Sequence, residues 1–69
     1  MAQRTGIERA IEKAGSQTVL ATELGVSQQV VSRWMRRGWV PASRVPEIAK
    51  RFGVPRASLI EPRLRALLG

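Results

Sequence analysis

The chain contains no cysteine and no histidine among its 69 residues. Without cysteine, a disulfide framework and a thiolate metal site are excluded. With no imidazole and only five carboxylates, there is little material for a metal site or a general base. We therefore expect no enzyme, and we expect no cofactor, metal ion or small-molecule ligand to be required.

Long apolar runs are also missing, and the first residues lack the apolar core of a signal peptide. We therefore expect a cytoplasmic protein with no membrane association. Apolar residues make up 43% of the chain, which is enough for the core of one small domain over residues 1–69. The order of the tail, residues 61–69, stays open at this point.

The net charge of +7 is concentrated in one part of the chain. Residues 1–25 carry three cations and three carboxylates, whereas residues 26–69 carry the other nine of the twelve cations against Glu47 and Glu61. An ordinary solvated basic surface is the plainer reading of the total. The uneven distribution favours a polyanionic partner such as nucleic acid.

Hydroxyl residues and glycines predict the ends of three helices. Thr5, Ser16 and Ser27 can each cap a helix N-terminus, and Glu8 is placed to complete a capping box with Thr5. A glycine follows each amphipathic stretch and can end it. The pattern predicts helices over residues 6–14, 17–24 and 28–37.

Prolines divide the sequence that follows. A fourth helix is predicted to begin near Ser43, with Pro46 in its first turn, where a missing amide hydrogen does no harm. Pro55 can open a short fifth helix through Ile60, which Pro62 then interrupts. No strand pattern is present, so the expected fold class is an all-α compact bundle of about five short helices.

The helix expected over residues 28–37 has two chemically different sides. Val31, Trp34 and Met35 fall on an apolar side that must face the core. The opposite side, here called the polar strip, contains no carboxylate, whereas an ordinary solvated helix would mix in acidic residues for ion pairs. The polar strip consists of Gln28, Gln29, Ser32, Arg33 and Arg36.

Amide and guanidinium groups suit the major groove of DNA. Glutamine matches N7 and N6 of adenine, and the arginine fork matches O6 and N7 of guanine or a phosphate. Contact of Arg33 with a base or with a phosphate is therefore predicted. Arg36 and Arg37 are phosphate candidates; the alternative is that they are solvated cations favoured by the dipole at a helix C-terminus.

Residues 17–36 resemble the helix-turn-helix unit of the phage Cro and repressor family. They read QTVLATELGVSQQVVSRWMR, and the wider stretch over about residues 7–60 is similar to the Cro-like YdaS branch of that family. The resemblance implies a chain encoded by a bacterium or a phage, folded as a lambda-repressor-like bundle with the helix-turn-helix at about residues 17–37. The matching small, glycine and apolar positions are Ala21, Gly25, Val26, Val31 and Trp34.

The resemblance also implies how the chain contacts double-stranded DNA. In this family the start of the second helix of the unit reads bases, and Gln17 would lie against a phosphate at the free amide hydrogens of its helix. From its place near the fourth helix, Arg44 is a further backbone-contact candidate, or else a capping residue. The base-edge positions implied are Gln28, Gln29, Ser32 and Arg33, with Ser27 and Arg36 near them or on phosphates.

One module of this size reads only a few base pairs. We therefore expect a homodimer on a pseudo-palindromic operator with half-sites about one helical turn apart. The leading expectation is a Cro-like transcriptional repressor that occludes a promoter. The alternatives are an antitoxin-type interaction module that also binds DNA, since YdaS-type proteins are often placed among antitoxins, and an excisionase-like architectural binder, which commonly adds a β-wing.

Two apolar features are not used in the DNA-binding hypothesis. Trp39, in the connector after the third helix, is expected to cover the core rather than to contact a partner. Leu64, Leu67 and Leu68 form an apolar stripe that could pack within the chain or against a second subunit.

Overall fold

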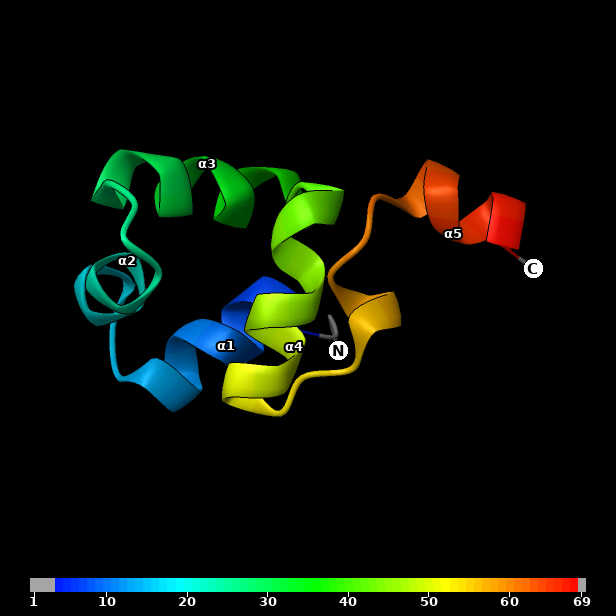
Figure 1. Cartoon of the computed structure of the whole chain (residues 1–69). Coiled ribbons are helices and arrows are strands. Elements are labelled where there is room, and N and C mark those ends of the chain that lie inside the picture. The colour runs from blue at the N-terminus through cyan, green and yellow to red at the C-terminus, as the bar shows by residue number, and fades with distance from the viewer. Residues whose placement is uncertain (1–3, 69) are drawn as a thin grey trace.

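The computed structural model describes residues 4–68. These residues form seven helical segments joined by short connectors (Figure 1). No strand occurs between these residues, so the predicted all-α class with five α-helices is confirmed. Within the same range, no helix combines the length and the apolar character needed to span a membrane. The segments are α1 (Gly6–Ala14), α2 (Gln17–Leu24), α3 (Gln28–Arg37), the 3₁₀ turn η1 (Ala42–Arg44), α4 (Val45–Phe52), the 3₁₀ turn η2 (Arg56–Ser58) and α5 (Pro62–Leu68).

Hydroxyl caps begin the first three helices, whose predicted bounds are all confirmed. The caps satisfy amide hydrogens that no helical carbonyl can reach. The arrangement differs from a standard capping box, because the Glu8 carboxylate accepts a hydrogen bond from the Thr5 hydroxyl at 3.3 Å rather than from the Thr5 backbone N–H. The cap bonds run from the N–H of Glu8 to Thr5 Oγ1 (3.2 Å), of Val19 to Ser16 Oγ (3.1 Å) and of Val30 to Ser27 Oγ (3.3 Å).

The core lies between the first four α-helices and the segments around η2. Trp34 is 3% exposed, which confirms its predicted place in the core. The prediction for Met35 is wrong, because 36% of this residue is exposed. It lies at the margin of the apolar side of α3, where its Sδ accepts the Gln17 side-chain amide at 3.4 Å. The largest fully buried side chains are Ile7, Leu20, Val31, Val40, Ile48 and Leu59.

The segments after α3 differ partly from expectation. Residues 42–44 form η1, and α4 follows with Pro46 in its first turn, as predicted. The predicted helix over residues 55–60 is wrong beyond the turn η2, which ends at Ser58. Leu59 is fully buried, and its carbonyl accepts the Val40 N–H at 2.9 Å instead of a hydrogen bond that would continue the helix. Pro62 begins α5 instead of interrupting a helix, since a first helical turn needs no amide hydrogen from it.

Helix α5 lies to one side of the other four α-helices (Figure 1). Leu64 and Leu67 are 41% and 82% exposed, so neither is packed into the core of its own chain. The side chain of Leu68, the third residue of the predicted stripe, lies outside the part that the structure describes. An apolar surface therefore remains on α5.

Candidate nucleic-acid interface

The turn between α2 and α3 fixes the position of the candidate recognition helix. Gly25 has φ 70° and ψ 30°, a left-handed conformation that suits glycine. The N–H groups of Gly25 and Val26 donate to the carbonyls of Thr22 and Ala21 at 3.3 and 3.0 Å, which is the Schellman pattern. In Figure 1, α2 is seen along its axis while α3 runs across the picture, so the two helices cross steeply. The pair forms the predicted helix-turn-helix unit.

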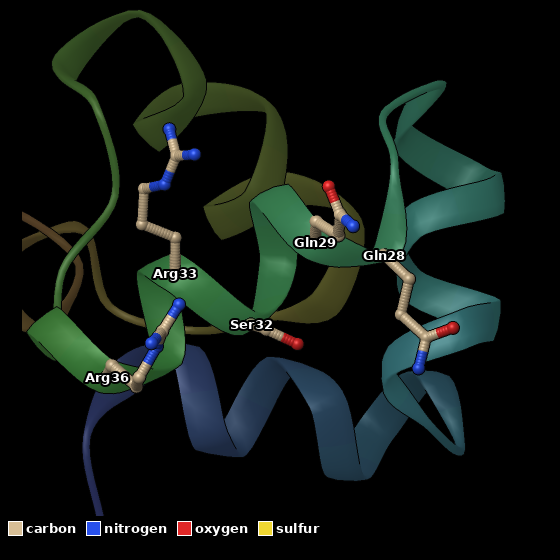
Figure 2. A pocket seen from close by; sticks show the side chains of 5 residues that line it. All are labelled: Gln28, Gln29, Ser32, Arg33 and Arg36. Atoms are coloured by element: carbon tan, nitrogen blue, oxygen red, sulfur yellow. The ribbon is translucent and has the colours of Figure 1, made fainter.

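The polar strip lies on the open side of α3. Val31 and Trp34 hold the opposite side in the core, so the strip residues point away from it. Figure 2 shows all five side chains of the strip on α3 with no ribbon passing in front of them. They line a shallow depression, to which no carboxylate contributes. Four of them are exposed, namely Gln28, Gln29, Arg33 and Arg36, and Ser32 is half-buried.

Two of the predicted DNA-contacting residues are bonded to each other. The Ser32 hydroxyl donates to Gln17 Oε1 at 2.7 Å, and Gln17 Nε2 donates to the Met35 sulfur at 3.4 Å. Sequence spacing gave no signal for this pairing, because it depends on the crossing of α2 and α3. The bond orients the Ser32 hydroxyl within the polar strip and the Gln17 side chain beside it. Since a thioether is a weak acceptor, the Gln17 amide can exchange it for a stronger one, such as a phosphate oxygen, at little cost.

Ser27 combines two functions at the start of α3. Its oxygen accepts the Val30 N–H as the N-cap. The side chain is exposed, so its hydroxyl hydrogen can still be donated to an external acceptor. Ser27 therefore lies at the edge of the polar strip as a capping residue with one donor to spare.

Arg44 and Arg51 both lie at the C-terminal end of α2. Arg44 Nη1 donates to the Leu24 carbonyl at 3.4 Å and to Glu47 Oε1 at 3.3 Å. Arg51 Nη1 donates to the Glu23 carbonyl at 2.6 Å. These carbonyls have no partner within their own helix, and cations there are favoured by the helix dipole. Arg44 is thus a capping residue, though for α2 rather than for its own helix.

Arg36 and Arg37 project in different directions, although they are consecutive. Arg36 lines the depression of the polar strip (Figure 2). Arg37 is turned away, and its guanidinium carbon lies 5.1 Å from the centroid of the Trp39 ring, a cation–π distance. Trp39 is half-buried, but it is not among the partly buried side chains that pack against the core, so its expected role as a cover stays a prediction. Of the nine predicted contact residues, Arg37 and Arg44 are therefore not brought into the strip.

The chemistry available at the strip is that of binding groups. It offers amide donors and acceptors, a hydroxyl and two guanidinium groups. Among residues 4–68, no three acidic, histidine or cysteine side chains come together as a cluster that could hold a metal ion.

A model of a known protein family matches most of the chain. The family model described as "Bacterial toxin YdaS" matches residues 7–59. The chain belongs to the YdaS family. Neither the curated proteins nor the solved structures contain a match to it. Membership of this Cro-like, phage-type family identifies a small phage-type regulator and confirms the resemblance drawn from the sequence.

The YdaS match covers the helices that build the candidate interface. It begins in α1, includes α2, α3 and α4, and ends at Leu59. Helix α5 lies beyond the matched residues, so the exposed leucines on it are a feature of this chain that the family match does not explain.

Proposed function

We propose that this YdaS-family protein binds double-stranded DNA by inserting α3 into the major groove, and that it represses transcription in the manner of Cro. The observation that carries the proposal is the exposed, carboxylate-free polar strip on a helix whose other side is fixed in the core. The major groove, about 12 Å wide, admits an α-helix, and each base pair presents a distinct pattern of donors and acceptors there.

The strip residues divide into base-reading and anchoring groups. Gln28 and Gln29, at the start of α3, can each make a paired contact with adenine, and Arg33 can do so with guanine. Arg36, Ser27 and Gln17 are suited to phosphates, which position the helix but carry no sequence information. Arg44 joins them only by exchanging its contact with the Leu24 carbonyl or with Glu47.

A dimer is part of the proposal. Helix α3 has ten residues and is roughly 15 Å long, so it spans only a few base pairs. Two copies on half-sites about one helical turn apart would give useful specificity. The exposed Leu64 and Leu67 on α5 support association, because apolar side chains of this size gain stability when a second surface covers them. The bound dimer would occlude a promoter, without any enzymatic step or cofactor, in the cytoplasm where the nucleoid lies.

The second candidate function is an interaction with another protein. The family description names a bacterial toxin. A toxin that inhibits growth can do so by binding a protein or by binding DNA. In either role the same exposed α5 could hold a partner. Growth of cells that express the wild type or Arg33→Ala separates the two roles. If the wild type inhibits growth and Arg33→Ala does not, the toxic effect depends on DNA binding; if both inhibit growth, the effect depends on a protein partner. The excisionase-like alternative gains no support, because residues 4–68 contain no strand for a β-wing.

Selection from a random pool of duplex DNA tests the proposal directly. The full chain is expected to enrich a pseudo-palindromic sequence. A Gln28→Ala/Arg33→Ala variant should lose this enrichment, and a Lys50→Ala variant, which changes an exposed cation on α4, should retain it. No enriched sequence from the wild-type chain would refute sequence-specific binding and leave the protein-partner role as the better account.

A further inference from the structure

A second hollow lies at the C-terminal end of α3, next to the polar strip. It is lined by residues from the start of α1, the end of α3, η2 and the first residue of α5. Arg36 lines the strip depression and Arg37 lines this hollow, so the two surfaces meet at consecutive residues. The lining residues that matter below are Arg4, Gly6, Arg9, Arg37, Gly38 and Ser58.

Close backbone approaches build this hollow into the fold. The backbone of Ser58 occupies the place where a side chain at Gly6 would begin, so α1 and η2 meet without a gap. At Gly38, which has φ 86°, an added Cβ would lie 3.4 Å from Thr5 Cγ2. The start of α1 is therefore held against both η2 and the end of α3, which fixes the backbone positions from which the arginines on α1 and α3 extend.

Arginine side chains dominate the charge of the hollow, and no carboxylate lines it. Arg4 forms an ion pair with Glu12, and the Glu8 carboxylate takes the Thr5 hydroxyl. Arg9 and Arg37 are exposed, and neither forms an ion pair with residues 4–68. Arg37 keeps its guanidinium over the Trp39 ring, an arrangement that leaves its N–H edge available.

We propose that Arg9 and Arg37 bind a phosphate of the DNA backbone beside the C-terminal end of α3; this rests on the proposed insertion of α3 into the major groove. Two guanidinium groups with outward N–H donors match phosphate oxygens in geometry and charge. The two arginines come from sequence positions far apart and converge at the end of the helix that enters the groove. They extend the interface beyond the polar strip.

The matched variants are Arg9→Gln/Arg37→Gln and a control, Lys13→Gln/Lys50→Gln. Each removes two cations from exposed helix positions, so net charge falls equally from +7. DNA binding of the full chain is measured against salt concentration on the selected duplex. The arginine variant should bind several-fold more weakly, with a slope of log K on log salt reduced by about 0.9 for each phosphate lost. Arg9→Lys/Arg37→Lys, which keeps the charge, should recover most of the slope.

A scan with neutral methylphosphonates locates the contact. Phosphates are replaced one at a time. At one or two positions, the replacement should weaken binding of the wild type and of the control Lys13→Gln/Lys50→Gln, but not of Arg9→Gln/Arg37→Gln. Equal effects at every position in all three proteins would overturn the proposal. Equal salt slopes for Arg9→Gln/Arg37→Gln and the control Lys13→Gln/Lys50→Gln would also overturn it.

A further arm separates DNA from free anions. The NMR signals of the Arg9 and Arg37 side chains are followed as inorganic phosphate is added. If they shift, while Arg9→Gln/Arg37→Gln and Lys13→Gln/Lys50→Gln have equal salt slopes for DNA binding, the hollow binds free anions and the assignment to DNA is wrong. If the wild type binds no duplex at all, the proposed function itself fails, and the assignment fails with it. These two failures are distinct, because only the first leaves wild-type DNA binding intact.

Discussion

Replacing Arg33 with alanine should separate recognition from folding. Arg33 is exposed in the middle of the polar strip, and its side chain forms no hydrogen bond or ion pair with residues 4–68. Removing an exposed side chain of this kind changes the free energy of unfolding by no more than about 0.5 kcal/mol. The melting temperature should therefore remain close to that of the wild type.

Binding should respond much more strongly than folding. Loss of a paired contact to guanine costs about 1–3 kcal/mol, and roughly 1.4 kcal/mol corresponds to a tenfold change in affinity. The dissociation constant for the operator should thus rise by roughly 5- to 150-fold. If Arg33 reads guanine, discrimination at that base pair should also relax. If it binds a phosphate, affinity should fall equally on all sequences, and the salt slope should fall by about one.

Fluorescence anisotropy of a labelled operator duplex measures this, with thermal unfolding followed on the same samples. Arg56→Ala is the matched control, because Arg56 is also exposed but lies on η2 outside the strip. Its affinity should change little. An operator affinity for Arg33→Ala equal to that of Arg56→Ala would refute the role given to the polar strip.

Further changes test other parts of the reasoning. Trp34→Ala should lower the free energy of unfolding by about 3–5 kcal/mol, because it leaves a cavity in the core; an unaltered denaturant midpoint would show that this side chain is not core. Wild-type affinity for DNA should fall steeply as salt rises, through counterion release, and a flat dependence measured by titration would contradict phosphate contacts. Gln17→Ala should weaken binding while shifting stability by about 1 kcal/mol or less, since the Ser32 hydroxyl it frees can turn to water; unchanged affinity would leave Gln17 with a structural role only. Leu64→Ser/Leu67→Ser should leave the fold intact and reduce dimer formation, measured by sedimentation with and without a palindromic duplex; an unchanged association constant would place the dimer contact elsewhere.

The first three helices could be predicted to the residue because their ends depend on local chemistry. Thr5, Ser16 and Ser27 satisfy amide hydrogens three residues away, and a left-handed glycine such as Gly25 ends a helix whatever lies around it. The helical periodicity over residues 28–37 likewise placed Val31 and Trp34 in the core and the polar strip on the open side, with Met35 as the exception. These features need no knowledge of how the helices pack.

The features that were missed all depend on packing. The helix predicted over residues 55–60 failed because burial of Leu59 outweighs helix continuation. The contact of Arg44 with α2 could not be foreseen, because the residue is 20 positions away from Leu24 in sequence. The same holds for the bond between Ser32 and Gln17. Counting charges treated all nine cations of residues 26–69 alike, although Arg44 and Arg51 complete a helix end.

One side of α3 packs in the core, and the opposite side is the proposed DNA-binding surface. Val31 and Trp34 orient the helix through the core, and Gly25 fixes where it begins. Gln28, Gln29, Arg33 and Arg36 contribute little to that orientation, because they are exposed and no side-chain hydrogen bond or ion pair links them to the rest of residues 4–68. Substitutions at these four positions should therefore change which operator is read without a loss of stability. Ser32 is the exception within the strip, since its hydroxyl couples α3 to Gln17 on α2. Under the proposed function, a change at Ser32 should therefore alter base contact and phosphate anchoring together.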